Sequence, residues 1–254
     1  MNKFVFTKRK KIIFISLIIC GVTFILELLK IPLIGKFFIG AVATYLLTLW
    51  VFDFMLKGME YIVLPLMPIL FYLSMILAYP ILERLDLHYL IYLALIGGMY
   101  ILLLTFNILD ITMDRPIPLS RAAWISLSLS RFIISFLVYT FLFWFHFDWY
   151  IIIFLIFIFT LFLTYPGFYL LIHELGRGER SFFYIIPSTL YVVEVGFLLS
   201  FWRIPFYGAG LILAATLYII TGILEAHLKA RLSRGFFWEY GVVALFAIFL
   251  LFFL

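Results

Sequence analysis

The residues of this chain that could do chemistry gather in one short stretch near its middle, which holds two carboxylates, two arginines and two prolines. Asp110 and Asp114 are four residues apart, so in a helix they share one face, with Asn107 three residues earlier. Such carboxylates could hold Mg²⁺ on a phosphate group. Arg115 and Arg121 follow, and an arginine fork matches the oxygens of a phosphate. The stretch therefore suggests a binding site for a lipid-linked phosphate at a membrane face.

The same stretch also fits a plain turn between two membrane helices. In that interpretation the arginines anchor two helix ends and the aspartates balance their charge. Pro116 and Pro118 suit such a turn, because proline removes a helix hydrogen bond. No metal site is predicted, and no cofactor is expected, with Mg²⁺ entering only under the phosphate interpretation. Both interpretations stay open at the level of the sequence.

Composition decides the class of protein. Of the 254 residues 67% are hydrophobic and 12% are charged, against roughly 45–50% and 25% in soluble domains. Since about 20 apolar residues span a bilayer, spans and short turns use up the whole chain. We expect one integral membrane domain over residues 1–254. The net charge of +5 comes from basic residues between spans, so membrane lipid is the expected partner and nucleic acid is not.

Apolar runs predict an all-α, polytopic transmembrane helix bundle of about nine spans. Most of the 18 basic residues fall on one side of the resulting topology, which predicts a cytoplasmic N-terminus and a multi-pass protein of the cell inner membrane. The predicted spans cover residues 12–29, 37–56, 61–82, 88–109, 119–145, 149–172, 181–202, 207–228 and 236–254.

Two polar faces are predicted inside the membrane. In the fifth span Arg121, Ser128, Arg131, Ser135 and Tyr139 recur at helical spacing. Arg131 lies roughly 18 Å along that helix, near the bilayer centre, where a charge needs a partner.

The seventh span offers Glu194 at a matching depth of roughly 20 Å. We therefore predict that Arg131 and Glu194 form an intramembrane polar pair. The pair would line a cavity in a transporter, or it would fix helix register in a closed bundle, and the sequence favours neither.

The pattern Asn107-Ile108, then Arg115-x-Ile117-Pro118-Leu119-x-Arg121-Ala122-Ala123, leads into a long helix rich in Phe and Leu. It resembles an uncharacterised family of bacterial multi-pass membrane proteins, classed as a domain of unknown function. The resemblance covers about the fourth to sixth spans and implies no activity, substrate or cofactor.

A shorter likeness concerns the asparagine followed by Asp-x-x-x-Asp and Arg-Pro-Ile-Pro. It resembles the aspartate-rich motif of UbiA-type membrane prenyltransferases. The motif stands after four spans instead of two, and a second such motif is missing, because Glu174 and Glu179 have the wrong spacing.

Three functions are compatible with the sequence. A membrane binding or assembly protein requires the least, and its protein partners cannot be named. An enzyme acting on a lipid-linked phosphate would use the aspartates and arginines of the central stretch at the cytoplasmic interface. A transporter would use Arg131 and Glu194 in a polar cavity near the bilayer midplane.

Overall fold

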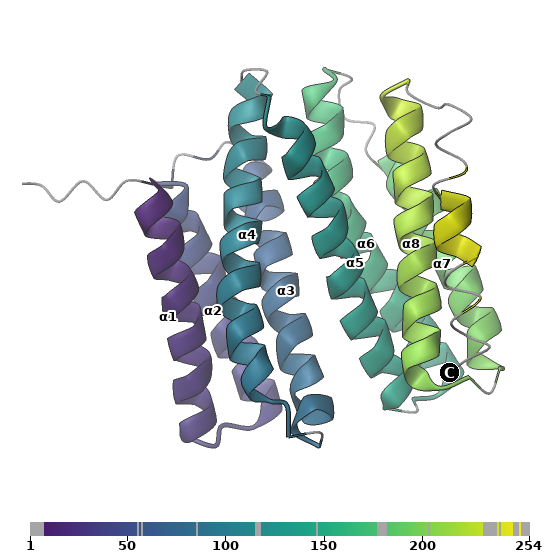
Figure 1. Cartoon of the computed structure of the whole chain (residues 1–254), viewed down its shortest axis with the longest axis horizontal. Coiled ribbons are helices and arrows are strands. Elements are labelled where there is room, and N and C mark those ends of the chain that lie inside the picture. Colours follow the sequence, from purple (N-terminus) through teal and green to yellow (C-terminus); the bar gives the residue numbers. More distant parts are fainter. Residues whose placement is uncertain are drawn as a thin grey trace, which may run out of the picture. The chain divides into compact units, whose positions relative to one another are not determined.

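The computed structural model describes residues 8–254 except 55, 57, 85, 115–117, 146, 177–181, 203, 231–237, 239, 246–248 and 250–254. Its long elements are eight α-helices (Figure 1). They are α1 (Lys8–Leu28), α2 (Leu33–Val51), α3 (Glu60–Glu83), α4 (Tyr89–Asp114), α5 (Ser120–Trp144), α6 (Trp149–Glu174), α7 (Phe182–Ser200) and α8 (Phe206–Leu228).

All eight helices are long and apolar enough to cross a membrane. The predicted all-α membrane fold is therefore confirmed, and eight of the nine predicted spans each correspond to one helix. The ninth, residues 236–254, lies mostly outside the described residues, although residues 240–245 are helical.

The chain folds as two compact units, residues 1–127 and 128–254, and the boundary falls within α5. Each unit is described by itself below. Unit 1 contains α1 to α4 and the first two turns of α5, and unit 2 contains the remainder of α5 with α6, α7 and α8. That the two units act as one integral membrane domain stays a prediction.

In unit 1 the helices approach closely where glycine faces an aromatic ring. A Cβ atom on Gly40 of α2 would overlap the hydroxyl of Tyr72 on α3, and one on Gly98 of α4 would overlap the ring of Phe71. Small residues at such crossings let membrane helices pack tightly. Gly40 and Gly98 therefore mark close helix contacts within unit 1.

The prolines of α3 do not end the helix, which runs unbroken through Pro65, Pro68 and Pro80. Proline leaves a backbone carbonyl without its usual donor, so such a helix needs cover from neighbouring protein. The helix has that cover, because it is the most buried of the eight spans.

Ion pairs fasten the α1–α2 hairpin of unit 1 at both ends. Lys11 in the first turn of α1 pairs with Asp53 just after α2, and Glu27 near the end of α1 pairs with Lys36 at the start of α2. Both lysines also lie over aromatic rings, at 5.9 Å from the ring of Trp50 and 5.2 Å from the ring of Tyr79. These charges sit near helix ends, where water is within reach and their cost is small.

Reporter fusions test the topology that these helices imply. We expect a reporter fused at Gly58, between α2 and α3, to be cytoplasmic, and one at Asp86, between α3 and α4, to lie on the other side. The reason is the excess of basic residues at the Gly58 side. A fusion at Gly176, four helices later, should match Gly58. Reporters at Gly58 and Asp86 on the same side would contradict the topology.

Candidate functional site

Arg131 is a charged side chain enclosed in unit 2. It lies in the middle of α5, where 2% of its surface is exposed. Its Nη1 donates a hydrogen bond to Oε1 of Glu225 on α8, at 2.8 Å. Because this carboxylate is also buried, the two charges neutralise each other inside the protein.

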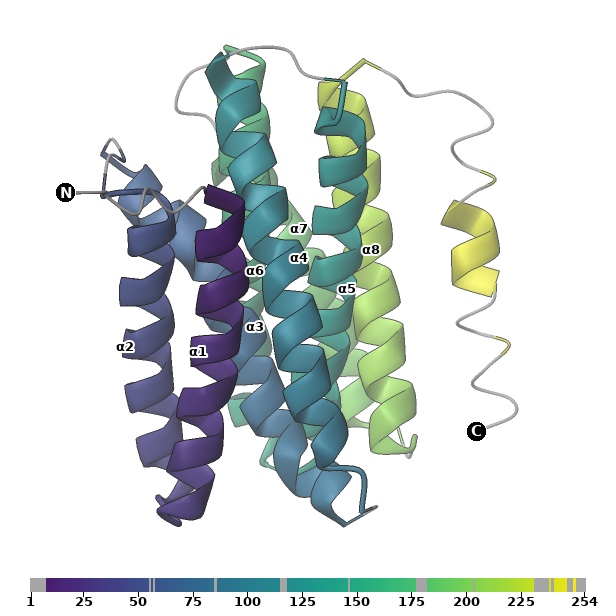
Figure 2. The ribbon, with the colours of Figure 1, turned by 60° about the vertical axis from the view of Figure 1, so that its left-hand side comes forward.

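The directions of the two side chains explain how they meet. Side chains on a helix lean toward its N-terminus. The described parts of α5 and α8 run antiparallel, with the start of α5 and the end of α8 on the same side (Figures 1 and 2). Arg131 therefore leans toward that side and Glu225, three residues before Leu228, leans away from it. The guanidinium and the carboxylate meet at a level between their two backbone positions.

A third helix, α6, packs against the Arg131–Glu225 ion pair. Gly167 of α6 lies against the guanidinium, and a Cβ atom there would overlap Nη2 of Arg131. Only a residue without a side chain lets the charged group approach α6 this closely. Pro166 precedes it, so α6 also lacks one backbone N–H at this level. One arginine thus joins α5, α6 and α8.

The Arg131 guanidinium has buried nitrogens for which the described residues provide no hydrogen bond. Nε and Nη2 of Arg131 are buried and have no hydrogen-bond partner among the residues that the structure describes. A buried polar group without a partner costs free energy, so the ion pair with Glu225 is the main compensation for burying this charge.

The polar face predicted for the fifth span turns inward over most of its length. Arg131, Ser135 and Tyr139 are all buried, whereas Arg121 at the start of α5 is exposed. The Tyr139 hydroxyl lies 2.7 Å from the hydroxyl of Thr160 on α6, which in turn donates to a carbonyl of its own helix. Hydrogen bonds therefore continue the contact between α5 and α6 beyond the ion pair.

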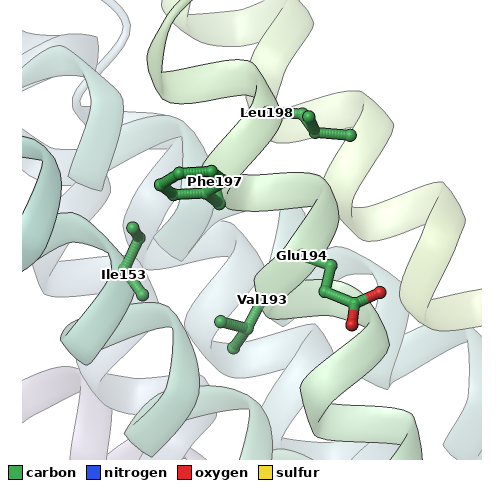
Figure 3. A pocket seen from close by; sticks show the side chains of 5 residues that line it. All are labelled: Ile153, Val193, Glu194, Phe197 and Leu198. Atoms are coloured by element: carbon green, nitrogen blue, oxygen red, sulfur yellow. The ribbon is translucent and has the colours of Figure 1, made fainter.

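The structure corrects the partner expected for Arg131. Glu194 is exposed on α7, where it lines a shallow groove of about 380 Å³ (Figure 3). The reason is helical phase. Val192 and Gly196, each two residues away, are buried, and two residues turn a helix by about 200°. Glu194 consequently faces outward from unit 2.

Glu225 was not among the predicted site residues, because it stands in the last turn of α8, where a charge is usually interfacial. A signal was present, since Leu213, Leu217, Thr221 and Glu225 recur every fourth residue and are all buried. An acidic residue that continues an inward stripe faces the bundle interior even close to a helix end.

The central stretch falls partly within the described residues. α4 continues to Asp114, beyond the predicted end of the span at residue 109, so Asn107, Asp110 and Asp114 lie on one helix, as the phosphate interpretation requires. Asn107 and Asp110 are half-buried, and Oδ1 of Asn107 has no hydrogen-bond partner among the described residues. Arg121 is exposed at the second position of α5.

Arg115 and the side chain of Asp114 lie outside what is described, so the phosphate site as a whole stays a prediction. Within the described residues, no three His, Cys, Asp or Glu side chains lie close enough together to hold a metal ion.

Substitution of each charged residue tests the pair. Arg131→Leu or Glu225→Leu strands a buried charge, so we expect each to lower the free energy of unfolding by about 3–5 kcal/mol. Denaturant titration in detergent measures this loss. The double variant Arg131→Leu/Glu225→Leu should recover part of it.

Glu194→Leu is the matched control, and its effect should stay within about 0.5 kcal/mol because the side chain is exposed. Losses that simply add in the double variant, or a Glu194→Leu as damaging as Glu225→Leu, would show that Arg131 is paired differently.

Comparison with known proteins matches most of the chain to a family whose function is unknown. The model of a protein family of unknown function, DUF5656, matches residues 55–254. The matched region begins after α2 and includes α3 to α8. No curated protein and no solved structure matches the chain. Because the matched region covers well over half of the sequence, the chain belongs to the DUF5656 family of proteins of unknown function.

Proposed function

We propose that this protein is a membrane binding or assembly protein of a bacterial inner membrane, with its N-terminus in the cytoplasm. The observation that carries the proposal is the closed Arg131–Glu225 pair, in which 3% and 12% of the two side chains are exposed. The charges that a midplane transport site would need are neutralised by each other and enclosed by protein. The pair acts as a device that sets the register of three helices.

Close helix contacts elsewhere in unit 2 support this role. A Cβ atom on Gly210 of α8 would lie 2.7 Å from the backbone nitrogen of Thr140 on α5. One on Gly196 of α7 would lie 2.7 Å from Ile156 of α6. Contacts this close leave little freedom for the helices to slide past one another, as we expect of a binding or assembly protein.

The outer faces of the helices suit contact with lipid and with other membrane helices. Large apolar side chains are exposed along the spans, among them Phe14, Phe38, Leu93, Leu129 and Phe154. Lipid covers such surfaces without a specific partner. Glu194 is different, because an ionisable group within a span marks a functional surface.

Native mass spectrometry in mild detergent tests the proposal on protein extracted from its own membranes. We expect the 29.9 kDa chain to carry at least one other integral membrane protein at fixed stoichiometry. The double variant Arg131→Leu/Glu225→Leu should keep this complex, because the buried pair has a structural role only. A chain found alone or only with copies of itself would contradict the proposal, and so would a double variant that is folded but has lost its partner.

An enzyme acting on a lipid-linked phosphate is the second candidate. The observation that favours it is the continuity of α4 to Asp114, which puts Asn107, Asp110 and Asp114 at spacings of three and four on one helix. Arg121, exposed in the first turn of α5, would bind the phosphate oxygens. Mg²⁺ would be the metal on the carboxylates.

Lipid retention tests this second candidate. Arg121→Glu should lower the amount of anionic phospholipid that co-purifies with the protein, because a phosphate loses both attraction and hydrogen bonds. Arg9→Glu is the matched control, since Arg9 is also exposed at the second position of its helix. Quantitative lipid mass spectrometry measures both variants. Equal lipid content in the two would remove the reason to place a phosphate at Arg121.

A further inference from the structure

The outward face of α7 carries a carboxylate at membrane depth. Glu194 lies about 18 Å along the helix from Phe182 and about 9 Å from Ser200. Its neighbours on this face are apolar, and Figure 3 shows its carboxylate and Leu198 on one side of α7, with Val193, Phe197 and Ile153 on the other. The carboxylate is therefore presented to whatever adjoins unit 2 in the bilayer.

The side chains around Glu194 are mostly apolar. A groove of about 380 Å³ is lined by Ile153 of α6, by Val193, Phe197 and Leu198 of α7, and by the apolar part of Glu194, whose carboxylate points away from Ile153 and Val193 (Figure 3). Tyr191 is exposed one turn earlier, at a spacing of three residues from the carboxylate. A long basic side chain that reaches the carboxylate would lay its alkyl part along the exposed Leu198, which lies on the same side of α7 (Figure 3).

The free-energy cost of placing a carboxylate in lipid indicates which chemical group lies beside Glu194. Exposing an acidic group to acyl chains costs free energy, and this cost falls when a cation or hydrogen-bond donor lies beside the group. Lipid chains offer neither. A lysine or arginine on a neighbouring membrane helix offers both, together with an apolar stem that can lie along Leu198.

The described residues of a second copy of this chain offer no such cation. Among the described residues the lysines and arginines other than Arg131 lie in loops or within the first or last turns of helices. Arg131 is enclosed by α5, α6 and α8 and pairs with Glu225. The described residues therefore favour a different protein as the source of the complementary charge.

We propose that the α7 face around Glu194 binds a transmembrane helix of another protein through a lysine or arginine at the depth of Glu194. This inference rests on the proposed binding or assembly function and names its contact surface. The partner helix lies along Tyr191, Glu194 and Leu198.

Model peptides provide the probe. The protein is reconstituted in phosphatidylcholine vesicles with a labelled, leucine-rich transmembrane peptide that has one lysine about 9 Å from an end. Association is measured by energy transfer from a dye on the protein. We expect the lysine peptide to bind about three- to thirtyfold more tightly than an all-leucine peptide, the range typical of polar contacts between membrane helices.

Charge exchange at one position supplies the decisive comparison. Glu194→Gln should remove most of the preference for the lysine peptide. Glu194→Lys should reverse it, so that a peptide with glutamate at the same place binds better. Since Glu194 is exposed, both variants should fold, and a melting temperature in detergent within a few degrees of the unmodified protein verifies this.

Several results would overturn the inference. One is equal binding of lysine and leucine peptides to the unmodified protein, and another is a preference for lysine that survives in Glu194→Gln. A third is a disulfide-linked homodimer formed in vesicles by Glu194→Cys in a Cys20→Ser background, which would assign the face to a second copy. A partner found by native mass spectrometry together with indifferent peptides would reject this face alone, leaving the binding function in place.

Discussion

The positive charge of Arg131 must be neutralised within the membrane, and three helices of unit 2 are arranged around that requirement. Its ion pair with Glu225 joins α5 to α8, and the absent side chain of Gly167 admits α6 to the same point. Breaking such a pair costs far more than replacing both partners with apolar residues. The pair therefore specifies which helices meet and at what level, more than it adds net stability.

The chain places its other membrane charges in two different ways. In unit 1, Lys11 with Asp53 and Lys36 with Glu27 lie at helix ends, where they fasten the α1–α2 hairpin near water. In unit 2, one pair is enclosed and Glu194 faces outward. Within the described part of unit 2, an outer surface that is otherwise suited to lipid thus carries an acidic group at membrane depth, and this contrast favours a binding role over catalysis or transport.

Much of the fold follows from hydropathy, because spans of about 20 apolar residues have few alternatives to helix in a bilayer. The inward face of α5 was also predictable from the spacing of Arg131, Ser135 and Tyr139. The partner of Arg131 was not, since matching depths by counting residues ignores the reach of the side chain and the phase of the opposite helix. Glu194 matched in depth but faces away, whereas Glu225 lies near a helix end and faces inward.

The most direct test of this account is the identity of the carboxylate beside Arg131 in a lipid bilayer. Solid-state NMR on protein with ¹⁵N-labelled arginine and ¹³C-labelled glutamate measures the dipolar coupling between a guanidinium nitrogen and a side-chain carboxyl carbon. The 2.8 Å contact between Nη1 of Arg131 and Oε1 of Glu225 predicts a strong coupling that disappears in Glu225→Gln and persists in Glu194→Gln. A coupling that persists in Glu225→Gln and disappears in Glu194→Gln would contradict the arrangement of unit 2 described above.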